Sequence, residues 1–374
     1  MNLKDLSGNF FVDDSKYIFW GAGKTCKEFY IFCKEYLEIS FIIDTNTNIK
    51  DKGFLDLKIY NPDEIFLKDL KYKIIITSVI YFTEIKKMLE DNGLEYNENF
   101  FYYKDIISLL KWKNKSELWI TQVDIPITTK CNAKCRDCSV LIPYYKKHED
   151  RSFDEIKKDI DLFFDFIDGI YDFIIVGGEA FINKEFIQIL SYIGDNYRNK
   201  IINLICITNG KIIPNYDFIN LFKKYDVEIQ ISDYSELFIN EEIKNKLKKV
   251  LSENSIKYKI LPMDRWVDYG NPYIKKNLGE TYLKKLFNNC NTQCRTLYDK
   301  KIYFCFRNCA AVRLGAIKSN ENDYIDLENK KLTKEEILNF EIGNLSLGYS
   351  TFCDYCNGQP SVNKKLIPAG IQVK

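Results

Sequence analysis

The sequence predicts an α/β protein whose strands pair mainly in parallel. Short apolar runs alternate with helical patterns along most of the 374 residues, and such alternation places helices on the faces of parallel sheets. Glycine or cysteine motifs directly follow several of the apolar runs, at the sheet edge where ligands bind in this class. At roughly 150 residues per domain, the length allows two or three domains.

The composition is that of a globular protein with balanced charge. The chain carries 54 Lys and Arg against 53 Asp and Glu, a net charge of +1, with 46% hydrophobic and 29% charged residues. This balance favours neither nucleic acid nor a membrane surface as a partner. No apolar run approaches the roughly 18 residues of a membrane span, and the first residues do not resemble a signal peptide. We therefore expect a cytoplasmic protein.

The cysteine and histidine contents restrict the chemistry. The chain has 12 Cys and one His, His148. A Ser-His-Asp or Cys-His catalytic arrangement, or a His-rich metal site, would have to rest on that single imidazole. In a reducing cytoplasm, cysteines in such number serve as metal ligands or reactive thiols rather than as disulfides. The spacing of the cysteines is therefore the main guide to function.

The first hundred residues predict a βαβαβ order. Apolar runs predict three strands, at residues 17–20, 39–43 and 73–80. A glycine turn at 21–26 follows the first strand, with a helical pattern up to Leu37, and a helix start at Pro62 precedes the third strand. This order predicts a small Rossmann-like domain over residues 1–112.

The glycine turn leaves two interpretations open. Gly21 and Gly23 supply two of the three glycines of a dinucleotide-binding fingerprint, whereas Cys26 stands at the third position. Asp44 follows the second strand. The turn either binds a nucleotide or nucleotide sugar, or belongs to a scaffold whose glycines serve only the turn.

A second α/β segment begins after a polar linker at 111–116. Its predicted strands are residues 118–128, 173–176, 204–208, 227–232 and 258–261. Between them, Ser152 opens a capping box for one helix, and an apolar stripe from Phe186 to Ile193 marks another. This order predicts a parallel sheet curved over its helices, with ligands at the carboxyl ends of the strands.

A cysteine loop follows the first of these strands. Cys131, Cys135 and Cys138 form a C-x3-C-x2-C pattern. Three thiolates this close can hold one metal centre and leave one position open for a ligand. The alternative is a structural zinc site completed from elsewhere, although zinc sites usually come as two C-x2-C pairs.

This loop, together with Gly177-Gly178-Glu179 after the second strand, resembles the radical S-adenosylmethionine (radical SAM) superfamily over residues 118–262. The resemblance implies a partial (β/α)6 barrel, which we place at residues 113–286. It also implies a 4Fe-4S cluster on the three cysteines, whose fourth iron binds S-adenosylmethionine. A flavodoxin- or ferredoxin-type protein would supply the electron.

The same resemblance implies the cofactor contacts. Gly177 and Gly178 would let the backbone approach the methionine amine, with Glu179 completing the motif. Asn209 and Ser232, after the third and fourth strands, match positions that contact ribose or carboxylate in relatives. One residue departs from the family pattern: Asp137 replaces a frequent aromatic residue, so adenine must pack on another side chain. The implied reaction produces a 5′-deoxyadenosyl radical that abstracts a hydrogen atom.

The last third of the chain carries a second group of cysteines. Its six members are Cys290, Cys294, Cys305, Cys309, Cys353 and Cys356. One auxiliary 4Fe-4S cluster needs four ligands. The pattern resembles the twitch and SPASM-like auxiliary-cluster domains of radical SAM dehydrogenases, which implies Cys294, Cys305, Cys353 and Cys356 as ligands in a domain over 287–374. Cys290 and Cys309 remain as spare thiols, and Lys300 stands where such domains usually have glycine.

The remaining candidates have plainer interpretations. Cys26, Cys33 and Cys206 are expected in the core, and His148 on the surface. Three residues are candidates for substrate binding, because guanidinium groups suit anions and indole suits a sugar face: Arg307, Arg265 and Trp266.

A fully cysteine-ligated cluster is suited to electron transfer, so the leading hypothesis is a dehydrogenase that oxidises a sugar, nucleotide sugar or aminocyclitol. Radical SAM proteins with an N-terminal Rossmann-like domain tend to occur with surface-polysaccharide enzymes, which favours a carbohydrate. The alternatives are peptide or protein modification by crosslinking, epimerisation or oxidation, and sugar epimerisation with Cys309 returning the hydrogen atom. A non-catalytic iron-sulfur or zinc scaffold is a third class.

Overall fold

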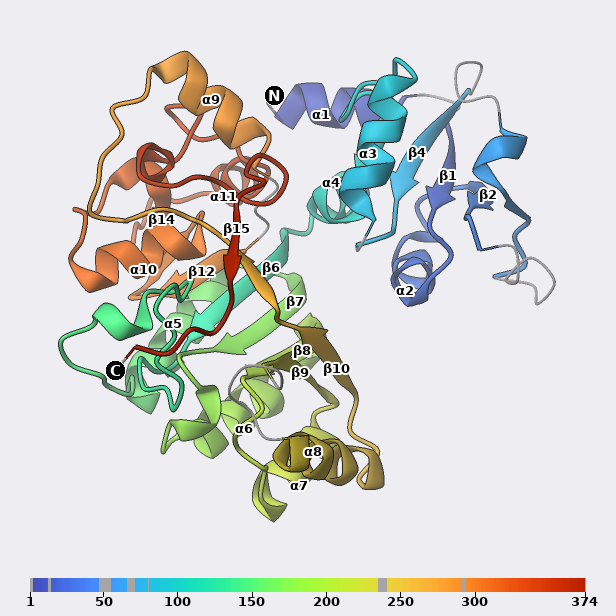
Figure 1. The fold of residues 1–374 in the computed structure, drawn as a ribbon. Coiled ribbons are helices and arrows are strands. Elements are labelled where there is room, and N and C mark those ends of the chain that lie inside the picture. The colour runs from blue at the N-terminus through green and yellow to red at the C-terminus, as the bar shows by residue number, and fades with distance from the viewer. Residues whose placement is uncertain are drawn as a thin grey trace. The chain divides into compact units, whose positions relative to one another are not determined.

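The computed structural model describes residues 3–12, 15–46, 55–65, 71–79, 81–234, 241–290 and 294–373. The chain forms two compact units, Met1–Glu117 and Leu118–Lys374, drawn as ribbons in Figure 1. Both units are mixed α/β folds with parallel sheets, as the sequence predicted. The finer division into three domains stays a prediction.

The first unit is built on five parallel strands in the order β3-β2-β1-β4-β5. The strands are β1 (Lys16–Trp20), β2 (Ile39–Ile43), β3 (Ile59–Tyr60), β4 (Tyr72–Ile76) and β5 (Phe100–Tyr102). The helices are α1 (Leu3–Phe10), α2 (Lys24–Cys33), α3 (Phe82–Asp91) and α4 (Tyr103–Lys115). All four apolar residues of β1 are buried, which explains the unbroken apolar run, because a central parallel strand is covered on both faces.

Two predicted boundaries in this unit were wrong. The helical pattern up to Leu37 ends earlier, because α2 stops at Cys33. The polar stretch 111–116, predicted as a linker, forms the last turn and a half of α4 and its left-handed end at Ser116. The ammonium of Lys111 lies 4.9 Å from the ring centre of Phe32, so a lysine that looks solvated in the sequence covers an aromatic surface. Ile80, the predicted end of a strand, lies outside the described residues.

The second unit contains an eight-stranded sheet in the order β10-β9-β8-β7-β6-β12-β13-β14. Its strands are β6 (Trp119–Pro126), β7 (Gly169–Val176), β8 (Ile201–Thr208), β9 (Val227–Asp233), β10 (Tyr258–Pro262), β12 (Arg295–Tyr298), β13 (Lys301–Tyr303) and β14 (Tyr324–Asp326). The first six in the sheet order are parallel, and β13 and β14 pair antiparallel.

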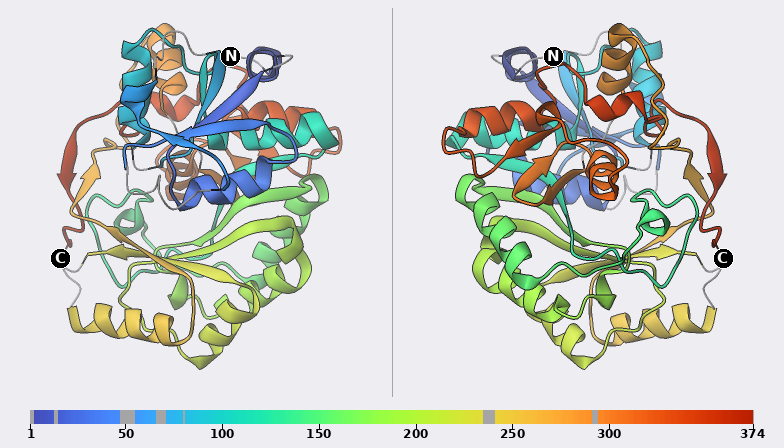
Figure 2. Two further views of the ribbon diagram at one scale, coloured as in Figure 1. Left: turned by 90° about the vertical axis from the view of Figure 1, so that its right-hand side faces the viewer. Right: turned by 90° about the vertical axis from the view of Figure 1, so that its left-hand side faces the viewer.

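Helices cover one face of the curved sheet, as both views in Figure 2 show. They are α5 (Phe153–Phe166), α6 (Phe186–Tyr197), α7 (Tyr216–Lys224) and α8 (Glu241–Glu253). The predicted capping box is present, because the Ser152 hydroxyl accepts from the Glu155 N–H and the Glu155 carboxylate accepts from the Ser152 N–H. Three further helices lie later in the chain: α9 (Glu280–Asn288), α10 (Phe306–Leu314) and α11 (Lys334–Glu341).

The sixth parallel strand, β12, comes from the cysteine-rich part of the chain. A buried ion pair fixes it, with Arg295 Nε 3.0 Å from Glu341 Oε2 and both side chains at most 3% exposed. The other carboxylate oxygen accepts from the Thr121 N–H on β6 at 2.9 Å. Because removal of one partner of a buried pair leaves an uncompensated charge, this contact ties β12, β6 and α11 together.

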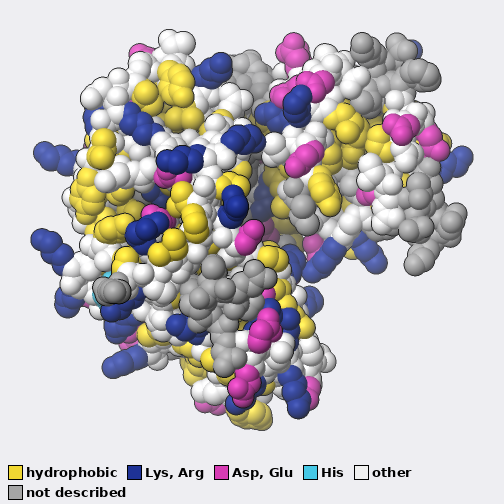
Figure 3. Space-filling view, viewed as in Figure 1, with side chains coloured by type: hydrophobic (Ala, Val, Ile, Leu, Met, Phe, Trp, Pro, Cys, Tyr) yellow, Lys and Arg dark blue, Asp and Glu magenta, His cyan; other side chains and the backbone are white. Residues whose placement is uncertain are grey.

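A smaller antiparallel pair completes the second unit. It joins β11 (Arg265–Val267) to β15 (Leu366–Pro368), so the end of the chain returns to the barrel. All 12 cysteines lie among the described residues and none forms a disulfide bond. No helix in the described ranges is long and apolar enough to cross a membrane. The face drawn in Figure 3 carries both basic and acidic side chains.

The turn between β12 and β13 yields a prediction. Asp299 and Lys300 have φ of 48° and 60°, the left-handed values of a two-residue hairpin turn that favours glycine at its second position. We expect Lys300→Gly to be more stable than Lys300→Ala by about 1 kcal/mol. Both variants lose the Lys300–Glu328 ion pair, so comparing their urea unfolding midpoints isolates the backbone effect. Equal midpoints would contradict this explanation.

Candidate functional site

The cysteine loop is held against the end of β7 by two backbone hydrogen bonds. The Gly178 N–H donates to the Thr128 carbonyl at 3.0 Å, and the Glu179 N–H donates to the Lys130 carbonyl at 2.8 Å. A Cβ on Gly177 would lie 2.7 Å from Thr128 Cγ2, and one on Gly178 would lie 2.4 Å from the Lys130 carbonyl oxygen. Both glycines therefore have a role within the protein itself: they let β7 approach the loop closely.

Glu179 ties this region to the next strand. Its side chain is 1% exposed, and its carboxylate accepts from the Thr208 hydroxyl at 2.9 Å and from the Asn209 N–H at 2.7 Å. Burial raises the pKa of Glu179 to about 7, against the opposing effect of these hydrogen bonds. The carboxylate is thus occupied by donors of its own chain and positions Asn209.

Asn209 lies beside the first cysteine. Its side-chain amide donates to Cys131 Sγ at 3.7 Å and to Asn132 Oδ1 at 2.8 Å. The sequence placed Asn209 at a cofactor contact, and the structure brings it to the cysteine loop. Its role toward a cofactor stays a prediction.

The three thiols of the loop lie close enough to influence one another. Burial raises the pKa of each. For Cys131, burial and, to a smaller extent, the negative charges of Cys138 and Cys135 together raise the pKa to about 11. Metal binding would have to displace the thiol protons. The donor set, three thiols on one loop, fits a 4Fe-4S cluster with one corner for a further ligand.

No group of three or more His, Cys, Asp or Glu side chains in the described ranges is arranged to hold a single metal ion. A cubane cluster spreads its ligands over separate corner irons, so its thiols stand further apart than the ligands of one ion.

Tyr234 is a residue of this site that the sequence analysis missed. Burial raises its pKa, and the charges of Cys135 and Cys138 raise it further, while a hydrogen bond from Ser232 lowers it. Its ring meets that of Trp266 edge to face, with centres 5.9 Å apart. Tyr234, which stands two residues after the predicted strand end, therefore lies near the cysteine loop and contacts both Ser232 and Trp266.

The second group of cysteines surrounds a pocket. Cys290, Cys305, Cys353 and Cys356 line it together with apolar side chains that include Phe287. Burial raises the pKa of Cys353, and the charges of Cys290, Cys305 and Cys356 raise it further.

Cys294 does not line this pocket. Its sulfur accepts a hydrogen bond from Gln122 Nε2 at 3.1 Å. It still lies near the group, because its charge, with those of Cys356 and Cys305, raises the pKa of Tyr269 beyond the effect of burial.

Arg307 lies near both groups of cysteines. The residue is 3% exposed, and its guanidinium donates to the Ser139 carbonyl at 2.9 Å and lies 4.5 Å from the ring centre of Tyr269. Its positive charge lowers the pKa values of Cys138 and Cys305 against the larger effect of burial. Arg265, by contrast, is exposed on β11.

The other candidate residues lie either in the core or on the surface. Cys26, Cys33 and Cys206 are fully buried, as expected. Cys309 is 1% exposed, and burial raises its pKa to about 12. His148 is exposed, with Nδ1 2.9 Å from the Thr129 carbonyl oxygen.

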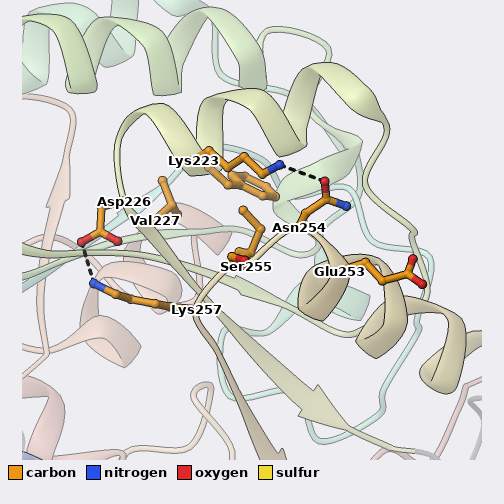
Figure 4. Close-up of a pocket in the computed structure, with 9 residues that line it drawn as sticks. Lys223, Asp226, Val227, Glu253, Asn254, Ser255 and Lys257 are labelled. Atoms are coloured by element: carbon orange, nitrogen blue, oxygen red, sulfur yellow. Dashed lines mark hydrogen bonds and ion pairs between the residues drawn. The ribbon is translucent and has the colours of Figure 1, made fainter.

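Further pockets lie away from the cysteines. One pocket of the first unit lies at the carboxyl ends of β1, β2 and β4 and is lined by Gly21, Gly23 and Asp44 among others. Asp44 Oδ2 accepts from the Ala22 N–H at 2.6 Å. Figure 4 shows a pocket between α7 and α8, at the amino-terminal edge of the second sheet, where Lys223 donates to Asn254 and Lys257 pairs with Asp226.

The glycine contact yields a prediction. In Gly178→Ala the new methyl group would meet backbone atoms of Lys130 and the Cβ of Cys131, so the cysteine loop has to shift. We expect a loss of about 1–3 kcal/mol in stability and less iron bound after anaerobic reconstitution. Gly279→Ala is the matched control, because nothing lies within 4 Å of a Cβ there. If both variants bind iron like the wild type, the packing role of Gly178 is wrong.

Comparison with known proteins gives two family matches. Residues 125–252 match the Radical SAM superfamily, and residues 13–100 match the family described as C2185-like, N-terminal. No match was found among curated proteins.

Three solved structures illustrate the weak structural similarity. BtrN in complex with AdoMet and 2-DOIA is 11% identical, with 65% of this chain and 94% of that chain covered and a TM-score of 0.44. The anSMEcpe protein with bound AdoMet is 12% identical, with 62% and 81% covered and a TM-score of 0.41. Streptococcus suis SuiB bound to precursor peptide SuiA is 18% identical, with 48% and 44% covered and a TM-score of 0.31.

These similarities are too low to assign a substrate. The family match, however, covers the cysteine loop and the Gly177-Gly178-Glu179 motif, whose close packing is described above. Residues 125–252 of this chain are therefore a domain of the Radical SAM superfamily.

Proposed function

We propose that the protein is a radical SAM dehydrogenase that oxidises an alcohol of a sugar, nucleotide sugar or aminocyclitol. The observation that carries the proposal is the second group of thiols, four of which line one pocket. Cysteines gathered in this way suit an auxiliary 4Fe-4S cluster, whose natural role is to accept or deliver an electron. A dehydrogenase needs such an acceptor after hydrogen abstraction.

The proposed ligands of the two clusters are chosen from the positions of the cysteine thiols. Cys131, Cys135 and Cys138 would hold the cluster that binds S-adenosylmethionine. Three of the sequence-predicted auxiliary ligands line the pocket: Cys305, Cys353 and Cys356. For the fourth we now favour Cys290 over Cys294, because Cys290 faces the pocket whereas the Cys294 sulfur accepts from Gln122.

When bound, S-adenosylmethionine and the clusters would supply a 5′-deoxyadenosyl radical for hydrogen abstraction and an acceptor for the remaining electron. The chain's own residues would bind and orient the substrate. Arg307 is the best placed of the three substrate candidates, because it lies near both cysteine groups and its buried Nε has no hydrogen-bond partner among the described residues. Such a donor suits a substrate oxygen or anionic group. Trp266 would offer an apolar face beside Tyr234.

The first unit supports a carbohydrate substrate. Its strand order, β3-β2-β1-β4-β5, corresponds to five of the six strands of the Rossmann order, and one of its pockets lies where the order of parallel strands reverses, between β1 and β4. We propose that this pocket accepts the nucleotide part of a nucleotide sugar. A flavodoxin- or ferredoxin-type reductant and a cytoplasmic location are parts of the same proposal.

The alternatives have less support. Sugar epimerisation would need Cys309 to return a hydrogen atom, yet its side chain is 1% exposed and packs inside the unit. Peptide modification remains the second candidate on the basis of the auxiliary thiols alone. Peptide modification and sugar oxidation differ in substrate and not in cluster content, so only substrate assays separate these two functions.

S-adenosylmethionine cleavage tests the superfamily chemistry. We expect anaerobically reconstituted and reduced protein to convert S-adenosylmethionine to 5′-deoxyadenosine, measured by liquid chromatography. Cys135→Ala should abolish this conversion, because the loop then keeps only two thiols. Cys206→Ala is the control, since that thiol is buried inside β8. Equal product from wild type and Cys135→Ala would refute the proposal.

Iron content tests the auxiliary cluster. Two 4Fe-4S clusters predict about eight iron atoms per chain, and one predicts about four. We expect Cys290→Ser to lower the iron content by up to about four atoms and Cys294→Ser to leave it near the wild-type value. The reverse result would restore Cys294 as the ligand, and about four iron atoms in the wild type would remove the auxiliary cluster.

A further inference from the structure

The last described residues run antiparallel to the cysteine loop and form an isolated β-bridge with it. The Arg136 N–H donates to the Ile371 carbonyl at 2.7 Å, and the Val373 N–H donates to the Lys134 carbonyl at 2.7 Å. These bonds place Gln372 opposite Cys135 in an antiparallel bridge. Residues 371–373, which we call the tail strand, therefore lie beside the middle cysteine of the loop.

The Gln372 side chain adds three further hydrogen bonds at this point. Its amide nitrogen donates to Cys135 Sγ at 3.2 Å and to the Gly370 carbonyl at 2.7 Å. Its amide oxygen accepts from the Lys134 N–H at 2.8 Å. These partners fix the orientation of the amide, because the oxygen faces a donor and the nitrogen faces acceptors.

The tail strand is anchored before it reaches the loop. β15 pairs with β11, and the buried Ala369 donates its N–H to the Asp264 carbonyl at 3.1 Å. Gly370, with φ of 64°, then turns the chain toward the cysteines. In Figure 1 the red end of the chain runs from β15 to the green loop. The contact with Cys135 is thus part of a continuous path from β11, the strand that carries Trp266.

A hydrogen bond to a ligand sulfur changes the electrostatics of a cluster. An N–H group that points at a thiolate stabilises its negative charge, and hydrogen bonds to sulfur are one determinant of cluster reduction potentials. Gln372 can therefore act on the iron centre without being one of its ligands.

We propose that Gln372 is a positioning residue of the first cluster: its amide orients Cys135 and, through the N–H···S bond, raises the reduction potential of the iron centre. The inference rests on the proposed cluster at Cys131, Cys135 and Cys138. It assigns a function to the tail strand, which lies more than 200 residues from the loop in sequence.

Three variants separate this role from support of the fold. Gln372→Glu keeps an acceptor for the Lys134 N–H but places a carboxylate where the donor stood. Gln372→Leu keeps the backbone bonds and removes both side-chain roles. Ile371→Ala is the matched control, because Ile371 is 38% exposed and its hydrogen bond to the loop is made by the backbone carbonyl.

The measurement is an anaerobic redox titration followed by electron paramagnetic resonance, with iron analysis and circular dichroism on each full-length variant. The signal that changes when S-adenosylmethionine is added identifies the first cluster. We expect Gln372→Glu to disfavour reduction about tenfold, which equals about 59 mV for one electron. Gln372→Leu should shift the potential in the same direction by less, and Ile371→Ala should match the wild type.

Each outcome decides the question. Iron loss in a folded Gln372 variant, with Ile371→Ala intact, supports the positioning role. Full iron and a wild-type potential in both Gln372 variants overturn it, as does global unfolding of Gln372→Glu, which would make the residue a support of the fold. If the wild type itself lacks a signal sensitive to S-adenosylmethionine, the proposed function fails, whatever the variants show.

Discussion

The close approach of the β7 end to the cysteine loop is the constraint on which the site depends. Gly177 and Gly178 have no side chains, so their backbone can lie against Thr128 and Lys130. This contact fixes the position of the backbone at Cys131, where the cysteine loop begins. The Glu179 carboxylate links this region to the end of β8, because it accepts from the Thr208 hydroxyl and the Asn209 N–H. The end of β7 thus holds the loop by backbone hydrogen bonds, and the end of β8 holds it through the side chains of Glu179 and Asn209.

The buried cation of Arg307 lies near both groups of cysteines. Arg307 is almost fully buried and forms no ion pair with a carboxylate of the described residues. A cation in such a place is costly unless negative charge lies nearby. In the proposed function, the thiolates of both groups would provide that charge once they bind iron. The Arg295–Glu341 pair differs, because there each charge has its partner in the fold and serves to hold β12.

The sequence predicted those parts of the molecule whose determinants are local. The cysteine loop, the Gly177-Gly178-Glu179 motif and the capping box at Ser152 each lie within a few residues, and their strands and helices were found from apolar periodicity. Contacts between distant segments were missed. Neither Tyr234 nor Gln372 carries a local signal for its position beside Cys135. The end of α4 was predicted as a linker for the same reason, because Lys111 covers the ring of Phe32, which lies on another helix.

The place of β12 in the sheet limits how the chain can be cut. This strand pairs with β6 on one side and with β13 on the other, although it begins one residue after Cys294. A fragment that stopped before it would leave β6 with an unpaired edge and invite aggregation. A module exchanged between related enzymes would therefore have to include β12 together with the other parallel strands. The cysteines next to β12 would then be transferred with the core of the sheet.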